Sequence, residues 1–179
     1  MKMAKKLLAL VLTGVMAMSV LTGCGSTASR QAVGKLEGML KEANPKATVE
    51  VGSETLANMA IDAATENGKL QTPASAKSSI RTALQNAKKD EYVWYTYFKA
   101  ESKNETEKAQ EISKVVLTKD GKAINSSEVL NAHSLNSQGN KPGDEFVLSM
   151  KEFTVKETNG GKTTDVVYIM AVVTCKPVK

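Results

Sequence analysis

An unbroken apolar run near the C-terminus, Val166 to Val173, constrains the fold most. Both alternate sets of side chains in this run are apolar, which is typical of a buried strand inside a sheet. The run follows a turn signal, Asn159-Gly160-Gly161, which in turn follows a second strand-like stretch, Phe146 to Val155. The pattern predicts a β-hairpin whose last strand is central in a sheet.

The first strand of this hairpin changes its side-chain parity. Phe146, Leu148 and Met150 share one face, whereas Phe153 and Val155 fall on the other. Successive side chains of a strand alternate between faces, so an extra residue would restore a single apolar face. We therefore expect a β-bulge near Lys151-Glu152.

A second strand is expected from Tyr92 to Phe98, which holds five of the eight aromatic residues of the chain. Aromatic and β-branched residues favour a pleated surface. Strand alternation predicts one face made of Tyr92, Trp94 and Phe98 and another made of Val93, Tyr95 and Tyr97. One face is expected to pack under helices. The other is either core or an amphipathic platform for a glycan or a peptide, and the candidate ligand-facing residues are Trp94, Tyr95 and Tyr97.

Three amphipathic helices are expected before the aromatic strand. Apolar residues at helical spacing, with terminating signals such as Asn44-Pro45 and Gly68, support them. Ser53 is the expected N-cap of the second helix, and Thr72 with Pro73 opens the third. The expected helices span about Ala32 to Ala43, Glu54 to Asn67 and Pro73 to Lys88.

The middle of the chain is less regular. Glu101 to Glu111 is highly charged and fits either a hairpin connection or a short exposed helix. Val115 to Leu117 followed by Asp120-Gly121 predicts two short antiparallel strands joined by a tight turn. Asn125 and Glu128 have capping-box spacing, which predicts a brief helix that carries His133.

Helices followed by antiparallel strands indicate the α+β class. We expect the helices to pack on one face of a four- to five-stranded antiparallel sheet, within one domain that covers residues 31–179. This order of elements is similar in outline to cystatin-like and related folds in which helices wrap a sheet.

The N-terminus has the layout of a secretory signal. Lys2, Lys5 and Lys6 precede an apolar run of 15 residues, Leu7 to Leu21. As a helix this run would span about 22 Å against a hydrocarbon core of about 30 Å, which disfavours a permanent transmembrane segment. Leu21-Thr22-Gly23-Cys24 closes the run.

This closing motif resembles the lipobox of bacterial lipoproteins. The resemblance implies cleavage between Gly23 and Cys24 and a thioether-linked diacylglycerol on Cys24. Two acyl chains give a stable membrane anchor. The implied organisation is a signal peptide over residues 1–23, a flexible lipid-anchored tether over 24–30, and a domain held at the cell membrane outside the cytoplasm. The alternatives are an ordinary secreted protein in which a cysteine follows the signal by chance, and a buried apolar helix.

Removal of 23 residues from 179 would leave 156, and the formal charge would fall from +5 to +2 because three lysines leave with the signal. This near balance argues against a nucleic-acid partner, which needs a clustered basic face. Cys175 would be the remaining cysteine. The apolar run before it favours a buried thiol, with an intermolecular disulfide or a reactive role as the alternative.

Catalytic motifs are missing from the sequence. His133 is the one histidine, and Leu135-Asn136-Ser137-Gln138-Gly139 lacks the first glycine of a nucleophile elbow. The acidic pairs Asp90-Glu91 and Asp144-Glu145 each precede a strand, where neighbours point to opposite faces. We assign no catalytic residue, metal ligand or cofactor.

The leading hypothesis is a non-catalytic binding or interaction domain, tethered through Cys24, whose partner is an envelope protein, a peptide or a glycan. One alternative is a cell-envelope hydrolase that uses dispersed carboxylates. Another is a structural accessory lipoprotein of an envelope complex.

Overall fold

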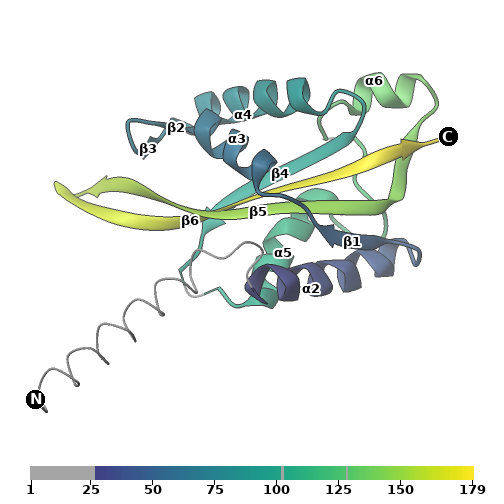
Figure 1. Ribbon diagram of the computed structural model, residues 1–179, viewed down its shortest axis with the longest axis horizontal. Coiled ribbons are helices and arrows are strands. Elements are labelled where there is room, and N and C mark those ends of the chain that lie inside the picture. Colours follow the sequence, from purple (N-terminus) through teal and green to yellow (C-terminus); the bar gives the residue numbers. More distant parts are fainter. Residues whose placement is uncertain (1–26, 102, 128) are drawn as a thin grey trace, which may run out of the picture.

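The computed structural model describes residues 27–101, 103–127 and 129–179. The expected signal peptide and Cys24 lie outside this part of the chain. The described residues form a mixture of helices and strands built on a four-stranded sheet with the order β1-β5-β6-β4 (Figure 1). These strands span Thr48–Val51, Lys141–Asn159, Lys162–Val178 and Tyr92–Lys99. The α+β class is therefore confirmed.

The sheet is mixed, so the expectation of an antiparallel sheet is wrong in one strand. β5, β6 and β4 pair antiparallel, but β1 runs parallel to β5, with Thr48 opposite Glu145 and Val51 opposite Leu148. β1 has only four residues and buries one side chain, that of Val49. A strand this short shows almost no period-two signal in the sequence.

Helices cover both faces of the sheet, which corrects the expectation of a single covered face. α2 (Thr27–Ala43) and α5 (Glu105–Val116) lie on one side, whereas α3 (Thr55–Ala64) and α4 (Pro73–Ala87) lie on the other (Figure 1). The cause is the apolar character of both faces of β4 and β6, each of which needs shielding from water. α2 begins at Thr27, within the segment expected to be a tether.

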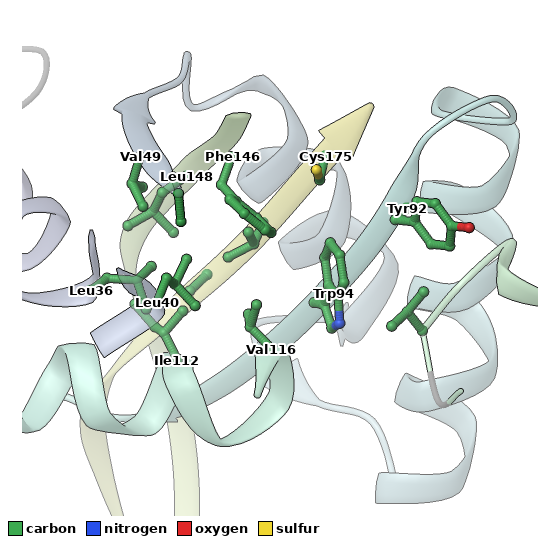
Figure 2. Close-up of a cluster of buried hydrophobic side chains, with 14 of the residues drawn as sticks. Leu36, Leu40, Val49, Tyr92, Trp94, Ile112, Val116, Phe146, Leu148 and Cys175 are labelled. Atoms are coloured by element: carbon green, nitrogen blue, oxygen red, sulfur yellow. The ribbon is translucent and has the colours of Figure 1, made fainter. Parts of the chain in front are cut away.

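The larger core lies between the sheet and the pair α2 and α5. Leu36 and Leu40 of α2 and Ile112 of α5 are fully buried there. They pack toward Trp94 of β4 and Phe146 of β5, as Figure 2 shows. This side of the sheet thus joins residues that are far apart in the sequence.

A second core lies under α3 and α4. α3 contributes small residues, Ala57, Ala60 and Ala64, and α4 contributes Ile80 and Leu84. They contact the opposite face of the sheet through Val93, Met170 and Val172. β6 is buried on both faces between β5 and β4, which confirms the expectation that it is central.

α3 is shorter than expected. It ends at Ala64, and the next residues form a two-stranded hairpin of β2 (Thr65–Glu66) and β3 (Lys69–Leu70). Asn67 and Gly68 make its turn with φ values of 51° and 73°. Asn-Gly suits a two-residue turn in which both residues have positive φ. Gly68 is therefore a turn residue and not a helix stop.

α5 replaces the strand expected at Val115 to Leu117. Its N-terminus is a complete capping box: the Asn104 side chain accepts from the Thr106 and Glu107 N–H groups, and the Glu107 carboxylate accepts from the Asn104 N–H. The hairpin expected around Asp120-Gly121 is reduced to a single bridge between Leu117 and Ile124. For the charged stretch from Glu101 to Glu111, the sequence allowed a hairpin connection or a short helix, and the helix is confirmed.

The helix expected from Asn125 begins later. α6 spans Ala132–Ser137 and follows Asn131, which has a left-handed conformation. Glu128 of the expected capping box lies outside the described residues. Among the described residues, no helix combines the length and hydropathy needed to cross a bilayer.

The β5–β6 hairpin is confirmed and extends well beyond the rest of the sheet (Figure 1). Its register is continuous through Lys151 and Glu152, so the bulge expected there is wrong. The irregularity lies between Pro142 and Phe146 instead. Phe153 keeps the parity of the α3 side, where it packs against Tyr168. The two apolar sets of β5 serve different cores.

Candidate binding cleft at the sheet edge

A cleft of about 640 Å³ lies along the outer edge of β4. Its floor is the strand itself at Tyr95, Thr96 and Tyr97. α4 forms one wall, and α5 with Asn125, Ser127, Val129 and Leu130 forms the other. Charged residues that line it in the described chain are Lys77, Arg81 and Lys114.

β4 is an edge strand, so half of its main-chain groups face the cleft. The Val93 carbonyl accepts from the Leu130 N–H at 3.0 Å, outside the sheet, whereas the Ala100 N–H donates to Val167 of β6 at 2.9 Å. Alternate residues of an antiparallel strand point their N–H and C=O groups to the same side. Tyr95 and Tyr97 therefore aim theirs outward, and within the described residues no backbone group pairs with them.

Trp94 lies on the α5 side of β4 and is only 3% exposed. Its indole N–H donates to the Asn125 carbonyl at 2.9 Å, and its ring centroid lies 6.0 Å from that of Phe146. The residue packs in the larger core and closes one end of the cleft.

Tyr95 and Tyr97 lie on the opposite face, toward α4, and both are half-buried. The Tyr95 hydroxyl donates to the Lys77 carbonyl at 3.4 Å. Burial raises the pKa of Tyr95, and the nearby charge of Arg81 acts in the opposite direction. The Tyr97 ring centroid lies 6.3 Å from that of Tyr168. The expected division of the aromatic residues between two faces is confirmed, with the three candidate residues split between them.

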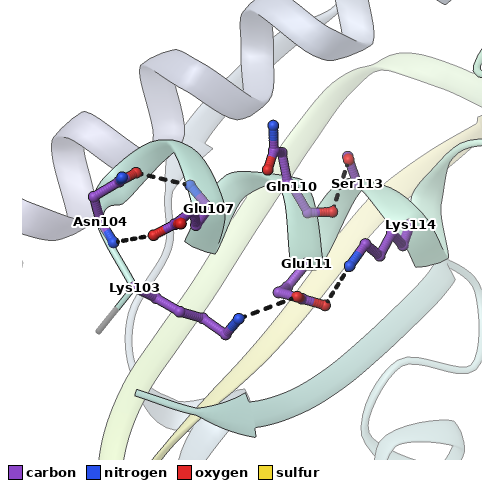
Figure 3. Close-up of polar contacts among 7 residues, drawn as sticks. All are labelled: Lys103, Asn104, Glu107, Gln110, Glu111, Ser113 and Lys114. Carbon is purple, nitrogen blue, oxygen red and sulfur yellow. Dashed lines mark hydrogen bonds and ion pairs between the residues drawn. The ribbon is translucent and has the colours of Figure 1, made fainter. Parts of the chain in front are cut away.

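The charge of the cleft comes mainly from α4. Lys77 and Arg81 are exposed and form no ion pair with any described residue. Lys114 differs, because its ammonium lies 2.9 Å from the carboxylate of Glu111, which also contacts Lys103 at 3.3 Å (Figure 3). The lysine contacts, the one to Lys114 above all, lower the pKa of Glu111.

A second cleft of about 590 Å³ lies beside α3 and β5. It brings together one member of each acidic pair, Glu91 and Glu145, with Glu50. Glu91 is engaged by the Lys88 ammonium at 2.7 Å. Outside this cleft, hydrogen bonds to the carboxylates lower the pKa values of Glu37, Glu111, Asp120 and Glu157.

Cys175 also contacts the second cleft but is only 2% exposed, which confirms the expectation of a buried thiol. Burial is the main cause that raises its pKa to about 12. His133 is exposed on α6 and lines neither cleft. Within the described residues, no group of three or more His, Cys, Asp or Glu side chains could hold a metal ion.

Sequence reasoning did not identify Lys77 and Arg81 as site residues. Their spacing of four places both on one side of α4. This signal is visible in the sequence, but its meaning depends on α4 lying beside the edge of β4. Comparisons with protein-family models, curated proteins and solved structures found no match.

Proposed function

We propose that this protein is a non-catalytic binding domain, tethered to the cell membrane outside the cytoplasm, and that the cleft along β4 is its binding site. The observation that carries the proposal is the open main-chain edge at Tyr95 and Tyr97, set within a cleft of about 640 Å³. Unpaired strand edges are ready templates for another chain. The partner is thus a protein or peptide of the cell envelope.

The membrane tether rests on the lipobox resemblance at Cys24. Only Gly25 and Ser26 separate Cys24 from the first residue of α2. A lipid on Cys24 would therefore keep the domain close to the bilayer and its partners. Mass spectrometry of the mature chain should find a diacylglycerol adduct on Cys24, and C24A should release the protein from the membrane fraction. An unmodified Cys24 would remove this half of the proposal.

Site-specific crosslinking in cells tests the cleft. A photo-crosslinking phenylalanine analogue replaces Lys114, which lines the cleft with its side chain 64% exposed. The matched control places the analogue at Lys35, an exposed residue of α2. We expect a discrete adduct with an envelope protein from position 114 that K77E/R81E abolishes. Identical adducts from both positions, or an adduct that survives K77E/R81E, would contradict the assignment of the cleft.

The carboxylate hydrolase is the second candidate, because Glu91 and Glu145 line one cleft. Glycosidase chemistry requires two carboxyl groups roughly 5 to 10 Å apart across such a cleft. If envelope-polymer hydrolysis is detected with the purified chain and lost in E145Q, this candidate replaces the binding domain. Hydrolysis at equal rates in E145Q would exclude a role for Glu145.

A further inference from the structure

We propose that the occupant of the β4 cleft is an extended acidic peptide that joins the sheet as a fifth strand next to β4. This inference rests on the proposed function and names the chemistry of the partner. Three features of the described residues carry it: the outward main-chain groups of β4, the basic side chains of α4, and the valine side chains in the wall opposite them.

On its outer side, the main chain of β4 already pairs with one residue, Leu130, as it would with an added strand. Leu130 forms an antiparallel bridge with Val93, and its N–H donates to the Val93 carbonyl at 3.0 Å. The next two outward-facing residues are Tyr95 and Tyr97, which line the cleft. A peptide strand alongside them would continue the hydrogen bonding that Leu130 begins. Main-chain bonds of this kind supply affinity without requiring a particular sequence.

The α4 wall selects the charge of the peptide. Pro73, Lys77 and Arg81 lie four residues apart, in a single row along the helix. The rise between Lys77 and Arg81 is about 6 Å. Residues two apart on a strand are separated by about 6.7 Å and share one face. Two acidic residues at positions i and i+2 of the peptide therefore match the two basic side chains.

The opposite wall selects the intervening residues. Val115 of α5 and Val129 are apolar residues on this side of the cleft, beside the polar Asn125 and Ser127, and Lys114 at the rim is already engaged by Glu111. Side chains of an added strand alternate between the two walls. The favoured peptide thus alternates acidic and apolar residues. Since the basic side chains are exposed, their contribution to affinity falls as salt rises.

A defined peptide tests this pairing. The probe is a fluorescein-labelled eight-residue peptide of alternating glutamate and valine, titrated with the full chain in detergent and followed by fluorescence anisotropy. A second peptide replaces glutamate by lysine. A third keeps the glutamates but carries N-methyl groups on alternate backbone amides, which removes main-chain donors and leaves the charge unchanged.

We expect saturable binding of the glutamate peptide and at least tenfold weaker binding of both control peptides. K77Q/R81Q should weaken binding at least fivefold, whereas K35Q/K46Q, which removes the same charge from exposed positions near α2, should change it less than twofold. Binding of the N-methylated peptide as tight as that of the unmethylated glutamate peptide would overturn strand pairing. An equal loss in K35Q/K46Q would overturn specific recognition by α4.

The outcome is separable from that of the proposed function. If crosslinking from position 114 depends on Lys77 and Arg81 but the glutamate peptide does not bind, the binding cleft stands and the acidic strand is excluded. If the peptide binds as expected but position 114 gives no specific adduct in cells, the pairing of an acidic strand with β4 stands and the envelope partner is excluded.

Discussion

The Ser149 hydroxyl of β5 accepts a hydrogen bond from the Ala57 backbone N–H of α3 at 3.1 Å. The same hydroxyl donates to the Ser53 carbonyl at 2.6 Å. Glu54, the N-cap residue of α3, makes no side-chain capping bond. A buried strand residue thus satisfies the start of a helix that is more than 90 residues away in the sequence.

S149A should destabilise the fold by about 1 to 3 kcal/mol, because it leaves the buried Ala57 N–H without a partner. We expect a lower midpoint in urea with an unchanged slope. S78A is the control, because Ser78 is exposed on α4 and should change stability by less than about 0.5 kcal/mol. Equal midpoints for S149A and the parent would show that the cap has no energetic role.

Cys175 should resist thiol reagents in the native state and react quickly after unfolding. The thiol is buried and its pKa is raised to about 12 from an ordinary value near 9. The unfolded state therefore releases this proton first, and its contribution to stability is present below pH 9 and lost as pH rises toward 12. Urea titrations between pH 8 and 11 should show that the free energy of unfolding falls less with rising pH in C175A than in the parent. Ellman's reagent in a C24A background measures the labelling rate.

Glu37 of α2 should make the attachment of β1 sensitive to acid. Its carboxylate accepts from the Val49 N–H at 3.0 Å and pairs with Lys41. The Lys41 contact, followed by the Val49 bond, lowers the pKa of Glu37. A depressed folded-state pKa contributes stability above pH 4.5 that is lost as the pH falls through the lowered value.

E37Q keeps an acceptor for the Val49 N–H but removes the charge. We expect it to cost less than about 1 kcal/mol at pH 7, and to lessen the loss of stability between pH 5 and 3. E37A should cost more than E37Q at pH 7 because the N–H loses its partner. If the free energy of unfolding depends on pH in the same way in E37Q and in the parent, the role of Glu37 in acid sensitivity is contradicted.

N104A should weaken α5 by about 1 kcal/mol, since it removes the acceptor for the Thr106 and Glu107 N–H groups. Figure 3 shows the contact between Asn104 and Glu107. A loss of about 2 to 4 °C in Tm is expected for a domain of this size. T106A alters an exposed side chain beside the same cap and serves as control. Circular dichroism melts should show this loss of Tm in N104A and not in T106A. Equal losses in the two variants would indicate a general effect of substitution and not the loss of the cap.

Local signals predicted the parts of the fold that local chemistry controls. Thr72 accepts from the Ser75 N–H and Pro73 occupies the first position of α4, as the sequence indicated. The two-sided apolar pattern of Val166 to Val173 correctly placed β6 in the centre. The same pattern is consistent with helices on both faces of the sheet, whereas the expectation from the order of elements was a single covered face.

Elements that depend on distant contacts were missed or misplaced. β1 is held by its pairing with β5 and by Glu37, neither of which leaves a mark on residues 48–51. α5 did carry a signal, the Asn104 and Glu107 capping box, within a stretch whose charge obscured its apolar face. The binding cleft needed the placement of α4 beside β4, which only the assembled fold provides.

The projecting part of the β5–β6 hairpin carries charges at Lys156, Glu157, Lys162 and Asp165, and the Lys156 N–H of β5 donates to the Gly68 carbonyl at 3.0 Å. Charged side chains on open strands discourage accidental pairing between molecules. From Tyr92 to Phe98, β4 carries no such charge. Among the described strands, the β4 edge that lines the cleft therefore lacks the charges that discourage strand pairing, whereas the projecting hairpin carries them.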